Sequence, residues 1–223
     1  MSKIKSNSPK LAIFDTFKTK SRQLTGEALR QRSIIISLAM GDNPMDKTRT
    51  SISKKIASQS GVVWKNLYSG VFRDLDEILI PLGLVEEEGR LPLKRGPKAL
   101  QEKGVPYYKL TQSGLLVSLS INEIKNRKEI LEGFFSNSSK DENEFYDIIL
   151  KLTEIAPKFT FSLFEKYVKA YCEGKLKLVP FKFQNLKDTS DEGLIIQKEF
   201  LECFTNLSKS EREKTVNLLN QVC

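Results

Sequence analysis

Residues 56–67 read IASQSGVVWKNL, and the spacing of small and apolar residues in this stretch decides the fold. Ala57 is followed by Gly61 four residues later and by Leu67 after six more. A small residue, a glycine and an aliphatic residue at these spacings let two short helices cross closely around a tight turn. The stretch therefore predicts a helix-turn-helix, and nucleic-acid binding is the first functional inference.

The chain beyond this turn predicts a two-stranded β-ribbon. Pro81 and Gly83 end the second helix, and a strand begins directly after them. A basic loop, residues 90–104, leads to the returning strand VPYYKLT at 105–111, and QSG at 112–114 opens another helix. The predicted fold class is mainly α: a winged helix-turn-helix with a two-stranded β wing, followed by a helical C-terminal part.

Two short motifs flank the predicted wing. The chain carries Gly-Leu-Val at 83–85 and Tyr-Lys-Leu-Thr-Gln-Ser-Gly at 108–114. This pattern resembles winged helix-turn-helix transcriptional regulators of the PadR, MarR and ArsR type, in which the first motif closes the recognition helix and the second leaves the wing. The resemblance covers about residues 24–120, with a longer wing than such families usually carry. It implies the fold and duplex DNA binding, without identifying a promoter or an effector.

Charge is divided unevenly along the 223 residues, whose formal net charge is +8. Residues 1–120 hold 20 Lys and Arg against 11 Asp and Glu, whereas residues 121–223 hold 16 against 17. The whole excess lies in the part that resembles a winged helix. Such a distribution is expected when one half of a protein faces a polyanion and the other does not.

Composition argues against several other classes. No apolar run approaches the ~18 residues of a membrane helix, and the basic N-terminus lacks the apolar core of a secretory signal, so we expect a cytoplasmic protein with no membrane contact. Cys172, Cys203 and Cys223 are widely spaced and odd in number, which disfavours a disulfide framework. With no histidine in the chain, imidazole catalysis and most zinc sites are not expected. We expect no enzyme, no cofactor and no metal site.

Paired acidic residues do not change this expectation. Asp74 with Asp76, and Asp188 with Asp191, lack the companion ligands of a catalytic or metal site. We interpret all four as solvated acids.

The sequence suggests three segments. Residues 1–23 form a basic arm, 24–120 the winged helix-turn-helix domain, and 121–223 a helical region for homodimerisation or partner binding. The arm is either a disordered tail or, through its apolar stretch 11–17, docked on a core or a second subunit.

Hydrophobic periodicity predicts the helices. The first spans residues 27–40, and Ser51 caps a second, shorter one. The recognition helix spans about 63–82, although Gly70 in its middle leaves open an alternative start at Ser69. The C-terminal helices are expected at 113–135, 142–155, 160–173, 194–207 and 210–222, with residues 178–183 as an extended piece or a short strand.

The predicted recognition helix presents a polar ridge. Lys65, Ser69 and Arg73 recur at four-residue intervals, and a major groove about 12 Å wide accepts such a helix. Arginine and lysine can pair with guanine and asparagine with adenine; the alternative is a solvated face with incidental charges. The candidate DNA-binding residues of the two helices are Lys54, Lys55, Lys65, Asn66, Ser69 and Arg73.

The wing, about residues 89–104, supplies a second set of cations. Side chains projecting from a two-stranded ribbon can grip phosphates or enter a minor groove, whereas the alternative is a loop kept soluble by its lysines. The candidate contacts of the wing are Arg90, Lys94, Arg95, Lys98 and Lys103.

Together these observations predict a sequence-specific protein that binds double-stranded DNA and acts as a transcriptional regulator. Two alternatives stay open, because a winged helix does not fix function. One is a protein-interaction module of a larger assembly, and the other is a replication or partition protein.

Overall fold

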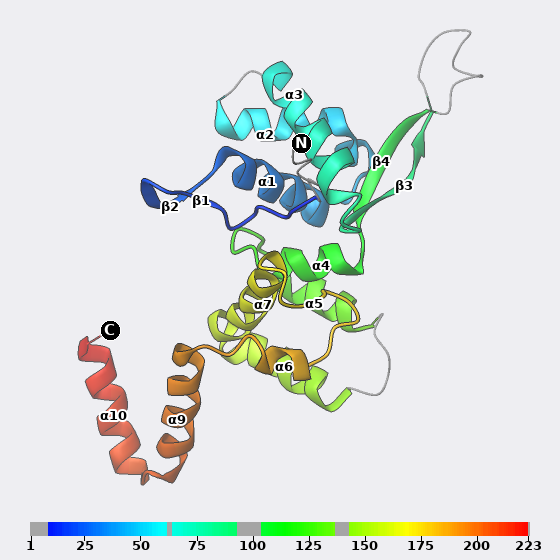
Figure 1. The fold of residues 1–223 in the computed structure, drawn as a ribbon. Coiled ribbons are helices and arrows are strands. Elements are labelled where there is room, and N and C mark those ends of the chain that lie inside the picture. Colours follow the sequence, from blue (N-terminus) through cyan, green and yellow to red (C-terminus); the bar gives the residue numbers. More distant parts are fainter. Residues whose placement is uncertain (1–8, 62–63, 93–103, 137–142, 223) are drawn as a thin grey trace, which may run out of the picture. The chain divides into compact units, whose positions relative to one another are not determined.

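The computed structural model describes residues 9–61, 64–92, 104–136 and 143–222 (Figure 1). Helices account for 65% of the structure and are joined by two antiparallel β-hairpins, which confirms the predicted mainly α class. The chain divides into two compact units, Met1–Phe183 and Gln184–Cys223.

An apolar segment near the N-terminus belongs to the core of the first unit. Leu11, Ala12 and Ile13 are at most 6% exposed, so the first three residues of the predicted docking stretch are buried. The Ala12 amide donates a buried hydrogen bond of 2.8 Å to Oε1 of Gln31. The chain then forms a hairpin of β1 (Thr16–Phe17) and β2 (Lys20–Leu24) and enters α1 (Gly26–Met40).

The second helix, α2 (Arg49–Ser60), follows a 3-10 helix at Pro44–Lys47. Thr48 caps α2, because its Oγ1 accepts a hydrogen bond of 3.3 Å from the Ser51 amide. The prediction that Ser51 itself caps the helix is therefore wrong: the 3-10 helix brings the chain into position three residues earlier. Gly61 ends α2 at φ +67°, a left-handed conformation that glycine adopts without strain.

The third helix, α3 (Trp64–Arg73), passes through Gly70 and continues as a π-helical segment at Asp74–Leu79. The alternative start at Ser69 is therefore wrong. A Cβ at Gly70 would lie 3.0 Å from Nε of Arg30, so the glycine leaves room for the side chain of that arginine from α1. The penalty of a mid-helix glycine is offset by this close packing.

A β-ribbon follows α3. Strand β3 (Val85–Leu91) pairs antiparallel with β4 (Val105–Leu110), and in Figure 1 the ribbon extends away from α1, α2 and α3. The pairing is irregular between Glu87 and Gly89, where the absence of a Cβ makes room for the Tyr107 ring. An isolated bridge between Thr48 and Tyr107 joins the ribbon to the start of α2.

Two residues of the motif at 108–114, Thr111 and Gly114, make close contacts where the chain leaves the ribbon. Thr111 donates a hydrogen bond of 2.5 Å from Oγ1 to the Gly83 carbonyl. The same oxygen accepts a hydrogen bond of 3.2 Å from the Gly114 amide, so Thr111 caps the N-terminus of α4 (Gln112–Leu119). A Cβ at Gly114 would lie 2.0 Å from the Leu84 carbonyl oxygen. The threonine and the glycine therefore fix how closely α4 approaches the chain between α3 and the ribbon.

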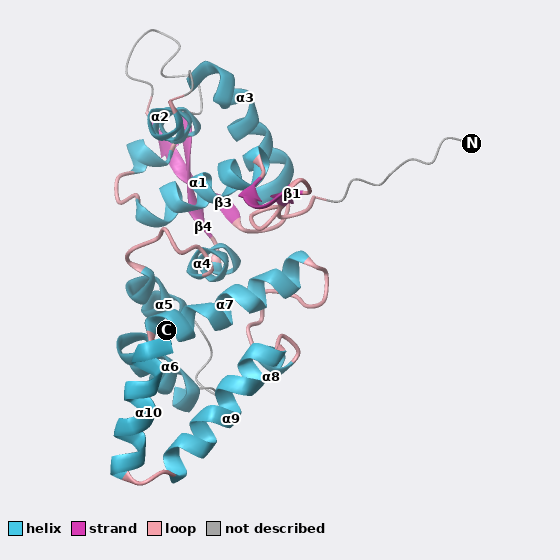
Figure 2. Cartoon of the chain, turned by 90° about the vertical axis from the view of Figure 1, so that its left-hand side faces the viewer, coloured by secondary structure: helices cyan, strands magenta, loops and turns pink. Residues whose placement is uncertain are grey.

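Four helices complete the first unit. The predicted single segment 113–135 is instead two helices, because the chain turns between them and places Ile121 and Ile124 in the core. Residues 178–183 form a loop in which Phe181 packs edge-on to Phe134 and Tyr167. The helices after the ribbon in this unit are α4, α5 (Arg127–Ser136), α6 (Asn143–Ile155) and α7 (Pro157–Cys172), which Figure 2 draws in cyan with the other helices.

The second unit contains a short helix and a helical hairpin. Helix α9 begins after Asp191, whose Oδ1 accepts a hydrogen bond of 3.0 Å from the Leu194 amide. Among residues 184–221 no side chain is fully buried. The helices are α8 (Gln184–Lys187), α9 (Glu192–Asn206) and α10 (Lys209–Val222).

Candidate nucleic-acid interface

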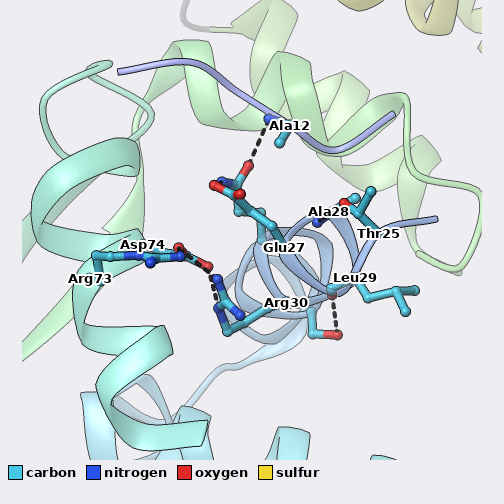
Figure 3. A network of polar contacts seen from close by, with 10 residues as sticks. Ala12, Thr25, Glu27, Ala28, Leu29, Arg30, Arg73 and Asp74 are labelled. Carbon is cyan, nitrogen blue, oxygen red and sulfur yellow. Dashed lines mark hydrogen bonds and ion pairs between the residues drawn. The ribbon is translucent and has the colours of Figure 1, made fainter. Parts of the chain in front are cut away.

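A buried ion pair fixes α3 on α1. Arg30 donates hydrogen bonds of 2.5 Å from Nε to Oδ2 of Asp74 and of 3.1 Å from its guanidinium to Oδ1 (Figure 3). The side chain of Asp74 is fully buried, and that of Arg30 is 17% exposed. The interpretation of Asp74 as a solvated acid is therefore wrong, since its carboxylate is a structural partner across the helix pair.

A second arginine joins α2 to α3 and to the ribbon. Arg49 forms an ion pair with Asp76, so this acid is also not simply solvated. The same guanidinium lies 3.9 Å from the centre of the Phe72 ring and 5.2 Å from that of Tyr108. Burial raises the pKa of the Tyr108 phenol, and the positive charge of Arg49 partly opposes this rise. Arg49 thus holds three elements together at one point.

The structure describes the side chains of two residues of the predicted polar ridge, Ser69 and Arg73. Ser69 is exposed, and the Arg73 side chain is 53% exposed at the last residue of the helix. A guanidinium nitrogen of Arg73 lies 3.8 Å from Oδ1 of Asp74. Lys65 and Asn66 belong to the first turn of α3, and their side chains lie outside the described part of the chain.

The flanking candidates occupy two elements. On α2, Lys54 is exposed and Lys55 is half-buried. On β3, Arg90 pairs with Glu87 through contacts of 2.6 Å and 3.0 Å. The remaining candidates of the wing, Lys94, Arg95, Lys98 and Lys103, fall in residues 93–103, outside the described residues.

The acidic base of the ribbon is matched by cations. Besides the Arg90 pair, Lys109 lies 3.4 Å from Glu86, and Lys47 lies 3.8 Å from Glu88. These carboxylates are exposed, so each contact is a surface ion pair of small energy. The negative charge of the sequence EEE at 86–88 is therefore largely compensated by neighbouring cations.

Sequence reasoning missed the residues that position α3. Arg30 and Asp74 are 44 residues apart, and Arg49 and Asp76 are 27 apart, so no local pattern connects them. The one available signal was Gly70, because a glycine inside a helical pattern often marks a close approach of another group.

Cys172 lies at a surface cavity of the first unit. The cavity has a volume of about 320 Å³ and is lined by Lys10, Phe14, Asp15, Lys169, Cys172 and Glu173. Burial raises the pKa of the Cys172 thiol to about 12, so the thiol is protonated at neutral pH and is a poor nucleophile. Within the described ranges, no group of three or more Cys, Asp or Glu side chains is placed to hold a metal ion.

Among the helices of the described chain, none combines the length and apolarity needed to cross a membrane. Searches for matching family models, curated proteins and solved structures found none for this chain.

Proposed function

We propose that residues 24–120 form a winged helix-turn-helix domain that binds duplex DNA and that the protein is a transcriptional regulator. In this proposal α3 enters the major groove, and the β3–β4 ribbon lies on the backbone or in a minor groove. The main support for the proposal is that the excess of positive charge lies in the same part of the chain as these elements. The 20 cations and 11 acids of residues 1–120 fall in the part that contains α2, its glycine turn, α3 and the ribbon.

The order of elements supports this domain type. Two helices joined through a left-handed glycine precede an antiparallel ribbon, and the Thr48–Tyr107 bridge ties the start of α2 to that ribbon. Arg49 and the Arg30–Asp74 pair hold α3 from its inner side. Its outer side, with Ser69 and Arg73, is left for a ligand.

Arg73 can leave its acidic neighbour without leaving a buried charge unpaired. Both carboxylate oxygens of Asp74 already accept hydrogen bonds from Arg30, whereas Arg73 lies at the longer distance of 3.8 Å. A turn of the Arg73 side chain toward a guanine would therefore cost little in the protein. We assign Arg73 to base readout, together with Lys65, Asn66 and Ser69.

The cations outside α3 are assigned to the phosphates. Arg90 would exchange an exposed carboxylate, Glu87, for a phosphate oxygen, and exposed ion pairs contribute little to stability. Lys54 is exposed on α2, the helix that crosses the backbone in this docking mode. Lys55 and the cations of 93–103 complete the set: Lys94, Arg95, Lys98 and Lys103.

Selection of binding sites from a randomised duplex library tests the proposal. A sequence-specific protein enriches one motif over successive rounds, whereas a purely electrostatic binder retains all sequences alike. Enrichment of a motif is expected. Retention without enrichment would reject sequence-specific readout, and no retention would reject DNA binding altogether.

A further inference from the structure

The surface cavity at Cys172 lies between two segments of the first unit that are far apart in the sequence. One wall comes from the segment before β1, and the other comes from the end of α7 and the residue that follows it. The volume of about 320 Å³ falls within the range of small-molecule sites, ~300–1,000 Å³. The cavity is therefore large enough for a small ligand.

Two of the charged residues that line the cavity are already paired within the protein. Nζ of Lys169 lies 2.7 Å from Oε1 of Glu165 and 5.2 Å from the centre of the Phe14 ring. Oε2 of Glu173 lies 2.6 Å from Nζ of Lys175. Lys169 and Glu173 therefore leave no uncompensated charge for a ligand.

The other two charged residues of the lining, Lys10 and Asp15, are not paired. Within the described part of the chain, neither side chain forms an ion pair or a hydrogen bond. Burial raises the pKa of the Cys172 thiol, the charge of Asp15 raises it further, and the charge of Lys10 lowers it. One cation and one carboxylate thus lie near the same thiol without pairing with each other.

The cavity as a whole is electrically balanced. The Cys172 thiol has a pKa of about 12, so it is protonated at neutral pH and adds no charge. The charges of Lys10 and Asp15 cancel in sum but stay separate in space. Such a site suits a ligand with no net charge and two opposite charged groups.

We propose that this cavity binds a small zwitterion, a free α-amino acid with an apolar side chain. Lys10 binds the carboxylate of the ligand and Asp15 binds its ammonium, each through a charge-assisted hydrogen bond. The half-buried ring of Phe14 offers apolar surface to the side chain of the ligand. A ligand with only one of the two charges would bring that charge near a like charge of the protein, which disfavours its binding.

Isothermal titration calorimetry of the full-length chain tests the proposal without DNA, so its outcome is independent of the proposed function. The zwitterionic probes are phenylalanine and leucine. Hydrocinnamate and phenethylamine are analogues of phenylalanine that lack its ammonium and its carboxylate, respectively. We expect at least one zwitterion to bind and both analogues to bind at least about tenfold more weakly than phenylalanine, because each loses a charge-assisted contact. No binding of either zwitterion at millimolar concentration, or equal binding of an analogue, would overturn the proposal.

Substitutions in the lining test where the ligand binds. Lys10→Gln and Asp15→Asn each remove one charge and should weaken binding at least about tenfold. Circular dichroism should show both variants folded, because neither side chain forms an ion pair or a hydrogen bond in the described structure. The matched controls Lys158→Gln and Asp147→Asn change the same charges at exposed positions outside the lining and should bind as the wild type does. Wild-type binding by the Lys10 and Asp15 variants, or equal weakening in the controls, would overturn the assignment of the site.

Discussion

Arg30 and Asp74 form a bidentate pair across 44 residues of sequence, and this pair fixes α3 to α1. Its carboxylate is fully buried, so removal of the arginine would leave an unpaired charge inside the protein. We predict that Arg30→Ala lowers the free energy of unfolding by about 3–5 kcal/mol.

Urea denaturation followed by circular dichroism measures this loss. Lys128→Ala is the control, because Lys128 pairs with Glu154 at 2.7 Å in an exposed position and its loss should change little. Equal effects of the two substitutions would contradict the structural role of Arg30.

Gly70 should respond to substitution in opposite ways with and without Arg30. In the wild type, a Cβ at position 70 would meet Nε and Cδ of Arg30 at 3.0 Å and 3.1 Å, so Gly70→Ala should destabilise the protein. In the Arg30→Ala background the same change should stabilise by about 1 kcal/mol, the ordinary helix preference of alanine over glycine. A double-mutant cycle measures the coupling, and additive effects would exclude contact between the two residues.

Substitutions on α3 and substitutions on the wing should affect DNA binding in different ways. Arg73→Ala and Lys65→Ala are predicted to lose about 1–3 kcal/mol of discrimination at particular base pairs, because they remove base contacts. Arg95→Ala and Lys98→Ala should weaken binding similarly on every sequence, because phosphates carry no sequence information. Site selection with each variant measures this, and identical preferences in all four would refute the role of α3.

Cys172 should be chemically inert in the folded protein. Burial holds the pKa of its thiol at about 12, against an ordinary value of 9.0, and only the thiolate reacts with alkylating agents. Labelling at neutral pH, followed by mass spectrometry, should be slow at Cys172 and should accelerate in urea. Rapid labelling of the native protein would contradict this burial.

The raised pKa of Cys172 should make the folded protein less stable at alkaline pH. The unfolded thiol releases its proton near pH 9.0, and the folded one near pH 12. The folded state therefore binds more protons in this window, and the contribution of Cys172 to stability, complete below pH 9.0, is lost as the pH rises.

Local patterns predicted the helices and the ribbon because their signals lie within a few residues. The apolar stripe of α3 and the turn at Gly61, which has a left-handed conformation, can be predicted from the local sequence alone. The break between α4 and α5 was missed, because a turn that buries Ile121 and Ile124 keeps an apolar pattern much like that of a continuous helix. Asp74 was misjudged because its partner lies in another helix.

The candidate site was predicted less completely than the fold. Exposed Ser69 and Arg73 follow from helical spacing, but the pairing of the neighbouring Asp74 with Arg30 depends on how two helices pack. The pairing of Arg90 with Glu87 depends in the same way on the irregular register of the ribbon. Spacing thus identifies which side chains share a face, while their partners follow only from the tertiary structure.

The central claim, that this protein binds duplex DNA through its N-terminal cations, is tested most directly by a salt titration of the full-length chain. Fluorescence anisotropy with a labelled duplex gives the affinity at each salt concentration. The account predicts a linear fall of log affinity with log salt, with a slope of about −0.9 for each phosphate that the protein neutralises. No binding at low salt, or binding that does not change with salt, would contradict it.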